Sequence, residues 1–573
     1  MSLVPELSQT PKLFRIPGRR FRAAPAILAA AAAASVTYTG AWIPSYWADE
    51  AATVRVAGLP VADLGPFLLH RDAVHGLYYL ILHTWGAVFG FSEASLRAPS
   101  ALAVGVSVAG LIVLGRMLRP GALGWLAAAL FLLLPRTGFS GIEARSYAWT
   151  AAAAILSTIC LVRLLRRRDE GGSARGSTVA YVAVTSIGVW LFVYLGLLVI
   201  AHAVTIAARS CARNRQAREA DRGLSAGWRR VADVLREVVP PTLPVLVLCS
   251  PILALAVIQR EQIAWLSTLD VANVWTVLAA PWAESSPVFA TVVAVLCTVA
   301  LVIGAVSQIR RTRGGVFRGV RGQMSEQSVR VVRAARATQT VRATQTVRAT
   351  QTVADLLGLG WLLIPWLALP TGLLAVTHLV ATPVFTARYL TLATPAVALL
   401  LAWLLVWFTG FWLRVAVVIA LAVSVAPTFV GQRTPYAKNG GSDLREISGV
   451  VAQHSSPGDG FYFEVSPVSS ALNPRFAYYG YPDAFRGRVD IGLRRAFPAT
   501  GEIGDDTRDM TEVPDAEVLT LRRIWVVTPG HPTCAEIPAI RDLSDRPAIQ
   551  ITLGARYEAY RTTACEVRIV PGR

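Results

Sequence analysis

The sequence predicts an α-helical polytopic membrane protein that carries a small α/β domain after its last span. Two observations lead to this fold class. First, 54% of the 573 residues are hydrophobic and only 16% are charged, whereas soluble globular proteins have about 25% charged residues. Second, several apolar runs reach about 20 residues, the length that crosses a bilayer core, and the chain turns polar after about residue 430.

The apolar runs predict about eleven spans. The first run follows a basic stretch but is long enough to remain a span, so we expect no cleavable signal peptide. Residues 76–90 are too short for a typical span, and we expect an interfacial helix on the outer face there. The expected spans cover residues 23–43, 98–115, 121–135, 146–165, 178–191, 193–208, 238–258, 285–308, 355–379, 389–408 and 411–429.

Arginine fixes the expected orientation. With residues 1–22 as a cytoplasmic tail, the inner segments hold about 30 Lys and Arg and the outer loops about 7, as the positive-inside rule requires. The net charge of +19 therefore reflects topology and not a nucleic-acid partner. Residues 314–353 contain the unit RATQTV three times in tandem and are expected to form a flexible, basic cytoplasmic loop.

The odd number of spans places residues 430–573 outside the cell. This segment is long enough to bury a core. SDLREISGVVAQHSS predicts a helix, GFYFEV and RRIWVVTP predict strands, and YEAYRTTACEVRIV predicts a terminal strand. Cys534 and Cys565 lie in this segment, where a disulfide and two free thiols are both open alternatives.

The first outer loop, residues 44–97, begins with the acidic pair of YWADE. Asp49 and Glu50 lie about one turn after the first span. A carboxylate there could accept a proton from a hydroxyl or hold a cation beside a phosphate; alternatively, the pair is simply solvated. The loop continues with LLHRDAVHGLYY, whose basic side chains suit a phosphate or an ordinary polar loop. The candidates in it are Arg71 and His75 for the phosphate, and His70 and Asp72 for the sugar or acceptor.

Three more outer segments carry candidate side chains at span ends, where ionisable groups are unusual. SGIEARSYAW has Arg145 and Tyr147, although Arg145 could instead pair with Glu143. An outer arginine in ATPVFTARYL runs against the positive-inside rule, so Arg388 and the adjacent Tyr389 suggest a phosphate at headgroup depth. IQREQIAWL offers amides and an indole for sugar hydroxyls and rings, although an interfacial Trp is often only an anchor. These residues are Gln259, Gln262 and Trp265.

Four motifs in this order resemble the GT-C superfamily of membrane glycosyltransferases. They are W-x-D-E after the first span, H-x-L-Y-Y in the first loop, E-A-R-S-Y before the fourth span and P-x-F-x-x-R-Y-L late in the chain. The chain looks most like glycosyltransferase family 39, which includes protein O-mannosyltransferases and the lipid A aminoarabinose transferase, and like actinobacterial mannosyltransferases. The resemblance covers roughly residues 24–430, and no MIR-type insert is recognisable.

The resemblance implies a GT-C fold and inverting transfer of a sugar, with mannose favoured, from a polyprenyl-phosphate donor outside the cell. Asp49 matches the acidic residue after the first span that is catalytic in that family, and Glu50 is its neighbour. Arg388 matches the late Arg-Tyr motif that holds the donor phosphate, and His75 matches a phosphate-proximal group more loosely. The acceptor could be a lipoglycan, a polysaccharide or a protein, and membrane lipids are expected partners.

No cofactor is implied, and a divalent cation is possible but not required. Walker, GxSxG and HExxH motifs are missing from the sequence. A transporter or flippase of lipid-linked glycans is the main alternative, although no repeat of spans supports it. A membrane scaffold that displays the C-terminal domain is the second alternative.

Overall fold

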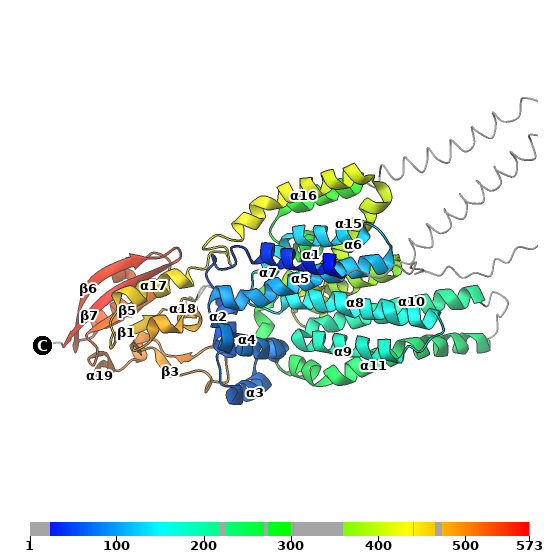
Figure 1. Cartoon of the computed structure of the whole chain (residues 1–573). Helices are drawn as coiled ribbons and strands as arrows, with labels where there is room; N and C mark the ends of the chain where they lie inside the picture. Colours follow the sequence, from blue (N-terminus) through cyan, green and yellow to red (C-terminus); the bar gives the residue numbers. More distant parts are fainter. Residues whose placement is uncertain are drawn as a thin grey trace, which may run out of the picture.

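The computed structural model is elongated, with helices at one end and a twisted sheet at the other (Figure 1). The structure describes residues 23–217, 224–268, 273–299, 302, 359–438, 440–464 and 473–571. The expected cytoplasmic tail (1–22) and low-complexity insert (314–353) lie outside the described residues.

The helical part is that of a multi-pass membrane protein. Among the described residues, seven helices are long and apolar enough to cross a membrane, or up to nine if each of two bent pairs is one span. The bent pairs are Leu123–Leu133 with Pro135–Gly141, at 70°, and Trp275–Ala283 with Pro287–Val299, at 96°. The seven helices cover Glu93–Leu118, Tyr147–Asp169, Val193–Arg213, Arg229–Ile258, Leu359–Val380, Ala387–Trp407 and Phe411–Gly431.

Apolar side chains from these helices form one large buried cluster. Where α5 crosses α6, a Cβ on Gly115 would lie 2.3 Å from the Cα of Gly124, so only glycines allow this approach. The helices of this part are α1 (Ala24–Tyr38), α5 (Glu93–Leu118), α6 (Leu123–Leu133), α7 (Pro135–Gly141), α8 (Tyr147–Asp169), α9 (Arg175–Leu191), η2 (Val193–Leu195), α10 (Gly196–Ala217), α11 (Leu224–Ile258), η3 (Arg260–Thr268), η4 (Trp275–Ala279), α12 (Ala280–Ala283), η5 (Ala387–Ala393), α15 (Thr394–Phe408) and α16 (Phe411–Gly431).

Each of the expected spans contains a helix of the structure, but several are shorter than predicted. α1 ends at Tyr38, five residues before the expected end, and Gly40 follows in a left-handed conformation with φ of 75°. α9 has only 17 residues. The run 121–135 ends at Pro135, where α6 meets α7 at 70°. Hydropathy located these segments, whereas the breaks arise from local backbone geometry.

The first outer loop folds into short helices between α1 and α5. They are α2 (Ala48–Ala57), α3 (Val61–His70), η1 (Ala73–His75) and α4 (Gly76–Phe89). Asp49 and Glu50 occupy the first turn of α2, where carboxylates are stabilised by the helix dipole. The expected interfacial segment 76–90 is helical as α4, with exposed Leu80 and Phe89; its depth relative to the bilayer stays a prediction.

The C-terminal domain is a five-stranded mixed sheet in the order β2-β1-β5-β7-β6. β1 pairs in parallel with β2 and β5, and β7 pairs antiparallel with β5 and β6. The strands are β1 (Gly460–Phe463), β2 (Val489–Asp490), β5 (Arg523–Pro529), β6 (Ile549–Glu558) and β7 (Thr562–Pro571), with β3 (Leu493–Arg495) and β4 (Asp506–Thr507) in a separate pair. The domain's helices are α17 (Leu444–His454), α18 (Phe476–Gly480), η7 (Pro482–Phe485), η8 (Met510–Glu512), α19 (Asp515–Val518), η9 (Cys534–Glu536) and α20 (Pro538–Asp545).

Side chains point alternately to the two faces of the sheet along each strand. Both faces therefore carry buried apolar residues, and helices pack on each of them. Phe461 and Trp525 pack with Ile447 of α17 on one face, whereas Tyr462 and Val526 pack with α20 on the other. The predicted helix and first two strands are confirmed. The predicted single terminal strand is wrong, because YEAYRTTACEVRIV contains the end of β6, a turn and β7.

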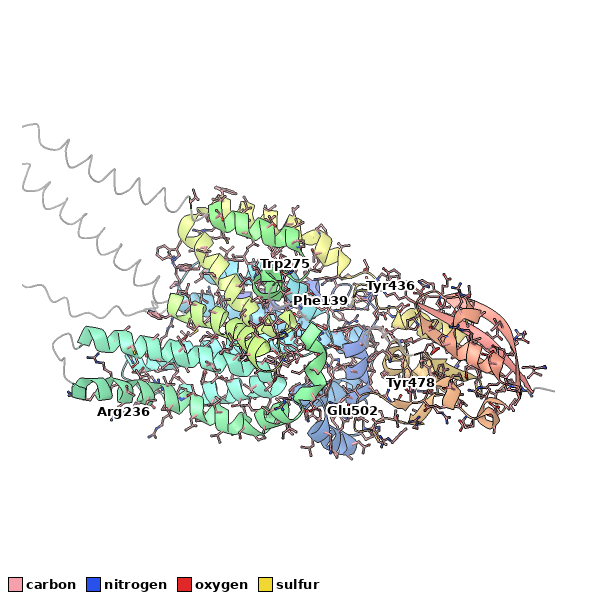
Figure 2. The ribbon with its side chains drawn as sticks, turned by 180° about the vertical axis from the view of Figure 1, so that it is seen from behind. Phe139, Arg236, Trp275, Tyr436, Tyr478 and Glu502 are labelled. Carbon is pink, nitrogen blue, oxygen red and sulfur yellow. A yellow bond between two sulfur atoms is a disulfide. The ribbon has the colours of Figure 1, made fainter. Side chains whose placement is uncertain are left out.

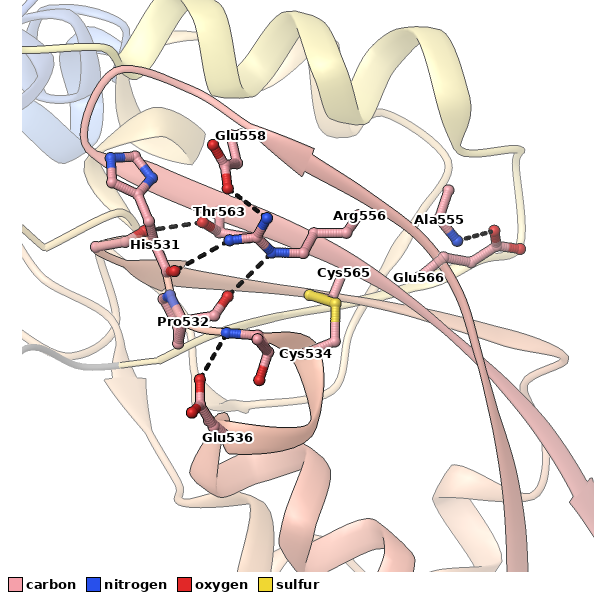
Figure 3. The surroundings of a disulfide bond; sticks show 12 residues. His531, Pro532, Cys534, Glu536, Ala555, Arg556, Glu558, Thr563, Cys565 and Glu566 are labelled. Atoms are coloured by element: carbon pink, nitrogen blue, oxygen red, sulfur yellow. Dashed lines mark hydrogen bonds and ion pairs between the residues drawn. A yellow bond between two sulfur atoms is a disulfide. The ribbon is translucent and has the colours of Figure 1, made fainter.

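Cys534 and Cys565 form a disulfide that joins η9 to β7 (Figure 3). The disulfide alternative therefore holds in the structure. It lies beside the turn of the β6–β7 hairpin, where Arg556 donates to the carbonyls of His531 and Pro532. The bond ties the C-terminal strand to the segment that follows β5.

The C-terminal domain packs on the first outer loop, close to α2. Arg445 of α17 donates to the carbonyls of Trp42, Ile43 and Pro44 and pairs with Glu93 at 2.6 Å. The hydroxyl of Tyr481 accepts from the backbone N–H of Tyr46 at 2.9 Å. Glu502 lies at this junction, whereas Arg236 lies at the far end of the helices (Figure 2). The start of α2 is therefore enclosed between the two parts of the chain.

Candidate functional site

A cavity of about 920 Å³ lies at the junction of the helices and the C-terminal domain. Five regions contribute to its wall: the start of α2, α7, the bend between Trp275–Ala283 and Pro287–Val299, the start of η5, and the end of α16. The C-terminal domain closes it with Phe476, Tyr479, Ile503 and Gly504. The other lining residues are Trp47, Ala48, Asp49, Ala52, Arg136, Phe139, Glu284, Ser285, Thr386, Ala387, Arg388, Thr428, Gly431, Gln432, Ala437 and Gly440.

Asp49 presents its carboxylate to this cavity between two guanidinium groups. Its Oδ2 lies 2.9 Å from Nη1 of Arg388 and 3.8 Å from Nη2 of Arg145. The Asp49 side chain is 26% exposed, whereas that of Arg388 is 16% exposed. The two arginines come from segments far from α2 in sequence, so the fold assembles two cations around one carboxylate; Asp49 and Arg388 line the cavity, whereas Arg145 does not.

Glu50 points away from the cavity, because consecutive residues of a helix are rotated by about 100°. Its carboxylate accepts from Nε and Nη2 of Arg97, at 2.8 and 2.6 Å, and from the N–H of Ala144 at 2.8 Å. Both side chains of this ion pair are fully buried. Burial alone would raise the pKa of Glu50, but Arg97 outweighs it and holds that pKa below the ordinary value.

Arg97 also fixes the chain that leads into α2. Its Nη1 donates to the carbonyls of Ala41 and Pro44, both at 2.7 Å, and its Nη2 donates to the carbonyl of Ser45 at 3.1 Å. The Glu50–Arg97 pair therefore positions the backbone from which Asp49 projects. Glu50 does not line the cavity.

A hydrogen-bond network holds Arg145. Its Nη1 donates to the hydroxyls of Tyr79 at 3.0 Å and Thr53 at 3.3 Å. The Tyr79 hydroxyl in turn donates to Asp72. Burial raises the pKa of Asp72, and Arg145 counteracts this. Arg145 thus contacts Asp49 and the first outer loop. The Glu143 carboxylate, the partner considered from sequence, accepts no hydrogen bond from the described residues.

His75 is held as a neutral ring. Nη2 of Arg145 lies 3.2 Å from its Nε2. A guanidinium only donates, so Nε2 accepts and the proton lies on Nδ1, which is 3.2 Å from the Ser146 hydroxyl. The ring stacks on Phe192 with centroids 5.1 Å apart. Burial and then Arg145 hold the pKa of His75 well below its ordinary value. A cationic contact of His75 with phosphate does not fit this arrangement.

Tyr147 and Tyr389 belong to an aromatic cluster behind Arg388. Tyr389 stacks on Tyr194 with centroids 4.5 Å apart, and its ring is 6.3 Å from that of Tyr147. Both tyrosines are buried. Tyr147 packs against η5, which carries Arg388 and Tyr389 in its first turn.

The remaining candidates whose side chains the structure describes lie away from the cavity wall. Arg71 pairs with Glu502 of the C-terminal domain, and Nδ1 of His70 lies 2.9 Å from the Pro66 carbonyl. Gln259 donates to the carbonyl of Leu68 and accepts from the N–H of Ala73, and Gln262 accepts from the N–H of Asp72. The two amides are therefore used to hold the outer loop. The side chain of Trp265 lies outside the described part of the structure.

Sequence reasoning missed Arg136 and Glu284, which form an ion pair on the cavity wall. Arg136 directly follows the expected span 121–135, on the side expected to be outer, and carries the same signal that indicated Arg388. Glu284 directly precedes the expected span 285–308, where an ionisable group is also unusual, but its pairing with Arg136 depends on the 96° bend that follows α12. The contributions of Phe476 and Tyr479 were equally invisible, since they come from a separate domain.

Two more buried charges lie near the wall. Nζ of Lys438 is 4.0 Å from the centroid of the Phe139 ring. Burial lowers the pKa of Lys438 and raises the pKa of Glu143, and each partly counteracts the shift of the other. In the described ranges, no group of three or more His, Cys, Asp and Glu side chains could hold a metal ion.

The arrangement suits chemistry on an anionic group. Guanidinium groups bind phosphate through charge-assisted hydrogen bonds, and a carboxylate beside them can accept a proton from a hydroxyl. Aromatic side chains and the C-terminal domain line part of the cavity, and the Asp49 side chain is 26% exposed.

No family model matches the chain, and no curated protein matches it by sequence. Five solved chains match it by structure. One is ArnT from Cupriavidus metallidurans bound to undecaprenyl phosphate, with 11% identity, a TM-score of 0.49, and coverage of 95% of this chain and 98% of that chain. The apo form of the same protein matches with 12% identity, a TM-score of 0.47 and the same coverage.

The archaeal oligosaccharyltransferase AglB from Archaeoglobus fulgidus, in complex with an inhibitory peptide and a dolichol-phosphate, is a further match. It has 13% identity and a TM-score of 0.39, and the match covers 88% of this chain and 69% of that chain.

Proposed function

We propose that the protein is a membrane glycosyltransferase that transfers a sugar, with mannose favoured, from a polyprenyl-phosphate donor to an extracytoplasmic acceptor. The acceptor is a lipoglycan, a polysaccharide or a protein. One observation carries the proposal: the carboxylate of Asp49 lies 2.9 Å from the guanidinium of Arg388 on the wall of a large cavity. These are the two residues that the sequence motifs singled out for acid–base work and for phosphate binding.

In the proposed reaction, Arg388 and Arg145 neutralise the donor phosphate, whose lipid remains in the bilayer beside the helices. Asp49 accepts the proton of the acceptor hydroxyl, and the acceptor oxygen attacks the anomeric carbon. The bond from that carbon to the phosphate oxygen breaks, and the polyprenyl phosphate leaves with the electron pair. Attack from the face opposite the phosphate inverts the anomeric centre.

Each part of the site supplies a known kind of catalytic effect. A positioned base contributes a factor of roughly 10² to 10⁴, and stabilisation of the leaving phosphate contributes more in a site shielded from water. His75, Tyr79 and Asp72 act through Arg145, which they orient. Glu50 and Arg97 act through the backbone that carries Asp49.

The proposed location of the site, on the outer face, has two supports. Arginines dominate the segments expected inside, at the end of the helices where Arg236 lies (Figure 2). The Cys534–Cys565 disulfide in the C-terminal domain is typical of an oxidising compartment. On this proposal the N-terminus is cytoplasmic.

The test is sugar transfer by the purified full chain from polyprenyl-phosphate mannose to acceptors of a membrane extract. Asp49→Asn should lose activity by a factor of about 10² or more. Asp63→Asn, at an exposed position of α3, is the matched control and should keep full activity. Equal transfer by wild type and Asp49→Asn would rule out Asp49 as the base. Lipid movement across vesicles without transfer from any lipid-linked sugar would support the transporter alternative.

A further inference from the structure

The cavity carries a second charged pair that the proposed transfer step does not use. Arg136 of α7 pairs with Glu284 at the elbow between Trp275–Ala283 and Pro287–Val299. Ser285 and Gln432 lie on the same wall. These polar side chains come from three separate elements, so only the folded chain brings them together.

Arg136 has unused capacity to bind a ligand. Its side chain is only 6% exposed, and its Nη2 donates to the carbonyl of Ala280 at 3.1 Å. Its Nε is buried and has no hydrogen-bond partner among the described residues. Trp47 also lies on the cavity wall, and its buried indole Nε1 likewise has no hydrogen-bond partner among the described residues. A buried donor without a hydrogen-bond partner is destabilising, and a bound ligand oxygen would satisfy it.

Glu284 is held in an unfavourable backbone conformation. Its φ is 53°, in the left-handed region that a residue with a Cβ rarely adopts. Such positions are over-represented at functional sites, where the surrounding structure maintains them. Here the conformation lets the sharp bend bring the carboxylate to Arg136.

The charge of this pair separates it from the Asp49 group. Asp49 faces two guanidiniums, so that group has an excess of positive charge and suits phosphate. Arg136 faces one carboxylate, so the second pair is balanced. Glu284 would repel an anion, whereas a carboxylate beside a guanidinium can accept from one hydroxyl and donate to the next.

Apolar groups complete the chemistry. Phe139, Phe476 and Ile503 line the same cavity, and apolar side chains pack well against the faces of a sugar ring. We propose that Arg136 and Glu284 form the acceptor subsite, and that it binds a neutral, hydroxyl-rich sugar residue of the acceptor. This inference rests on the proposed function, and it narrows the acceptor to a glycan.

The test uses the full chain in lipid nanodiscs and two separate binding measurements. The first measures polyprenyl phosphate, and the second measures a panel of octyl-linked disaccharides of mannose, galactose, glucose and arabinose. Wild type should bind at least one disaccharide saturably. Glu284→Gln and Arg136→Lys should weaken that binding at least about tenfold and leave polyprenyl phosphate binding unchanged. Asp63→Asn is the control for both.

Arg388→Lys should give the reverse pattern, with weaker polyprenyl phosphate binding and unchanged disaccharide binding. Equal disaccharide binding by wild type and both subsite variants would overturn the inference. So would a wild type that binds no disaccharide. Failure of wild type to bind polyprenyl phosphate, with disaccharide binding intact, would count against the proposed donor and not against this subsite.

Discussion

Glu50 and Arg97 form a fully buried ion pair one residue away from the partly exposed carboxylate of Asp49. Adjacent acidic residues thus have different environments. Glu50 faces the interior of the outer loop, and Asp49 faces the cavity.

Replacement of Glu50 should destabilise the protein more than replacement of Asp49. Glu50→Ala leaves the Arg97 guanidinium buried without its carboxylate, which costs about 3–5 kcal/mol. Asp49→Asn should cost less, about 1–3 kcal/mol, because its carboxylate is 26% exposed and the amide oxygen can still accept from Arg388. Thermal unfolding in detergent measures both. Similar unfolding midpoints for the two variants would contradict the structural role of Glu50.

The neutral state of His75 predicts a pH dependence of stability. The pKa of His75 is lowered by burial and by Arg145, so the unfolded chain binds a proton that the folded chain does not. Stability from this group is therefore complete above the unfolded pKa, about 6.5, and is lost as pH falls below it.

The measurement is the unfolding midpoint between pH 7.5 and 5, with wild type compared with His75→Gln. The variant removes the titrating ring, so its midpoint should fall less on acidification. Asp72, whose pKa is raised, contributes in the opposite direction but is common to both proteins. Parallel curves would mean that His75 is not held neutral.

Arg55 and Asp505 should control how the C-terminal domain closes the cavity. The Arg55 guanidinium lies over the rings of Tyr479 at 3.8 Å and Phe497 at 4.6 Å and pairs with Asp505. Asp505 also pairs with Arg475 at 3.0 Å. Asp505→Asn should leave Arg55 poorly compensated, whereas Arg475 keeps its ion pair with Asp490. The substitution should destabilise the domain interface by about 3 kcal/mol and speed proteolysis between α16 and α17.

Asp483→Asn provides the matched control. Asp483 pairs with Arg486, but both side chains are more than 80% exposed, at 83% and 82%. Exposed pairs contribute about 0–1 kcal/mol, so proteolysis should be unchanged. An equal response of the two variants would argue against a structural interface at Asp505.

Loss of the Cys534–Cys565 disulfide should destabilise the C-terminal domain. The bond closes a loop of sequence separation 31, and native disulfides of this kind contribute about 2–5 kcal/mol. The double substitution Cys534→Ser and Cys565→Ser should lower the unfolding midpoint of the domain in tryptophan fluorescence, reported by Trp525. Cys211→Ser, at an exposed free cysteine, should have no effect.

The sequence by itself determined the location and order of the apolar helices and the presence of a C-terminal α/β domain; it predicted about eleven spans, whereas seven to nine of membrane length lie among the described residues. These features depend on local hydropathy and periodicity, which each segment carries on its own. It also indicated Asp49, Arg145 and Arg388, because charged groups at outer span ends are rare enough to stand out. It missed the hairpin of β6 and β7, because the predicted terminal strand took in only the last two residues of β6 together with the turn and β7.

Only the tertiary structure decided which of two adjacent acids faces the cavity, because that depends on where Arg97 and Arg388 lie around α2. It also decided that His75 accepts from Arg145, that Gln259 and Gln262 hold the outer loop, and that Arg136 meets Glu284. Each of these pairings joins residues far apart in the chain. How the helices pack and bend determines which residue pairs with which, and a local sequence pattern does not contain this information.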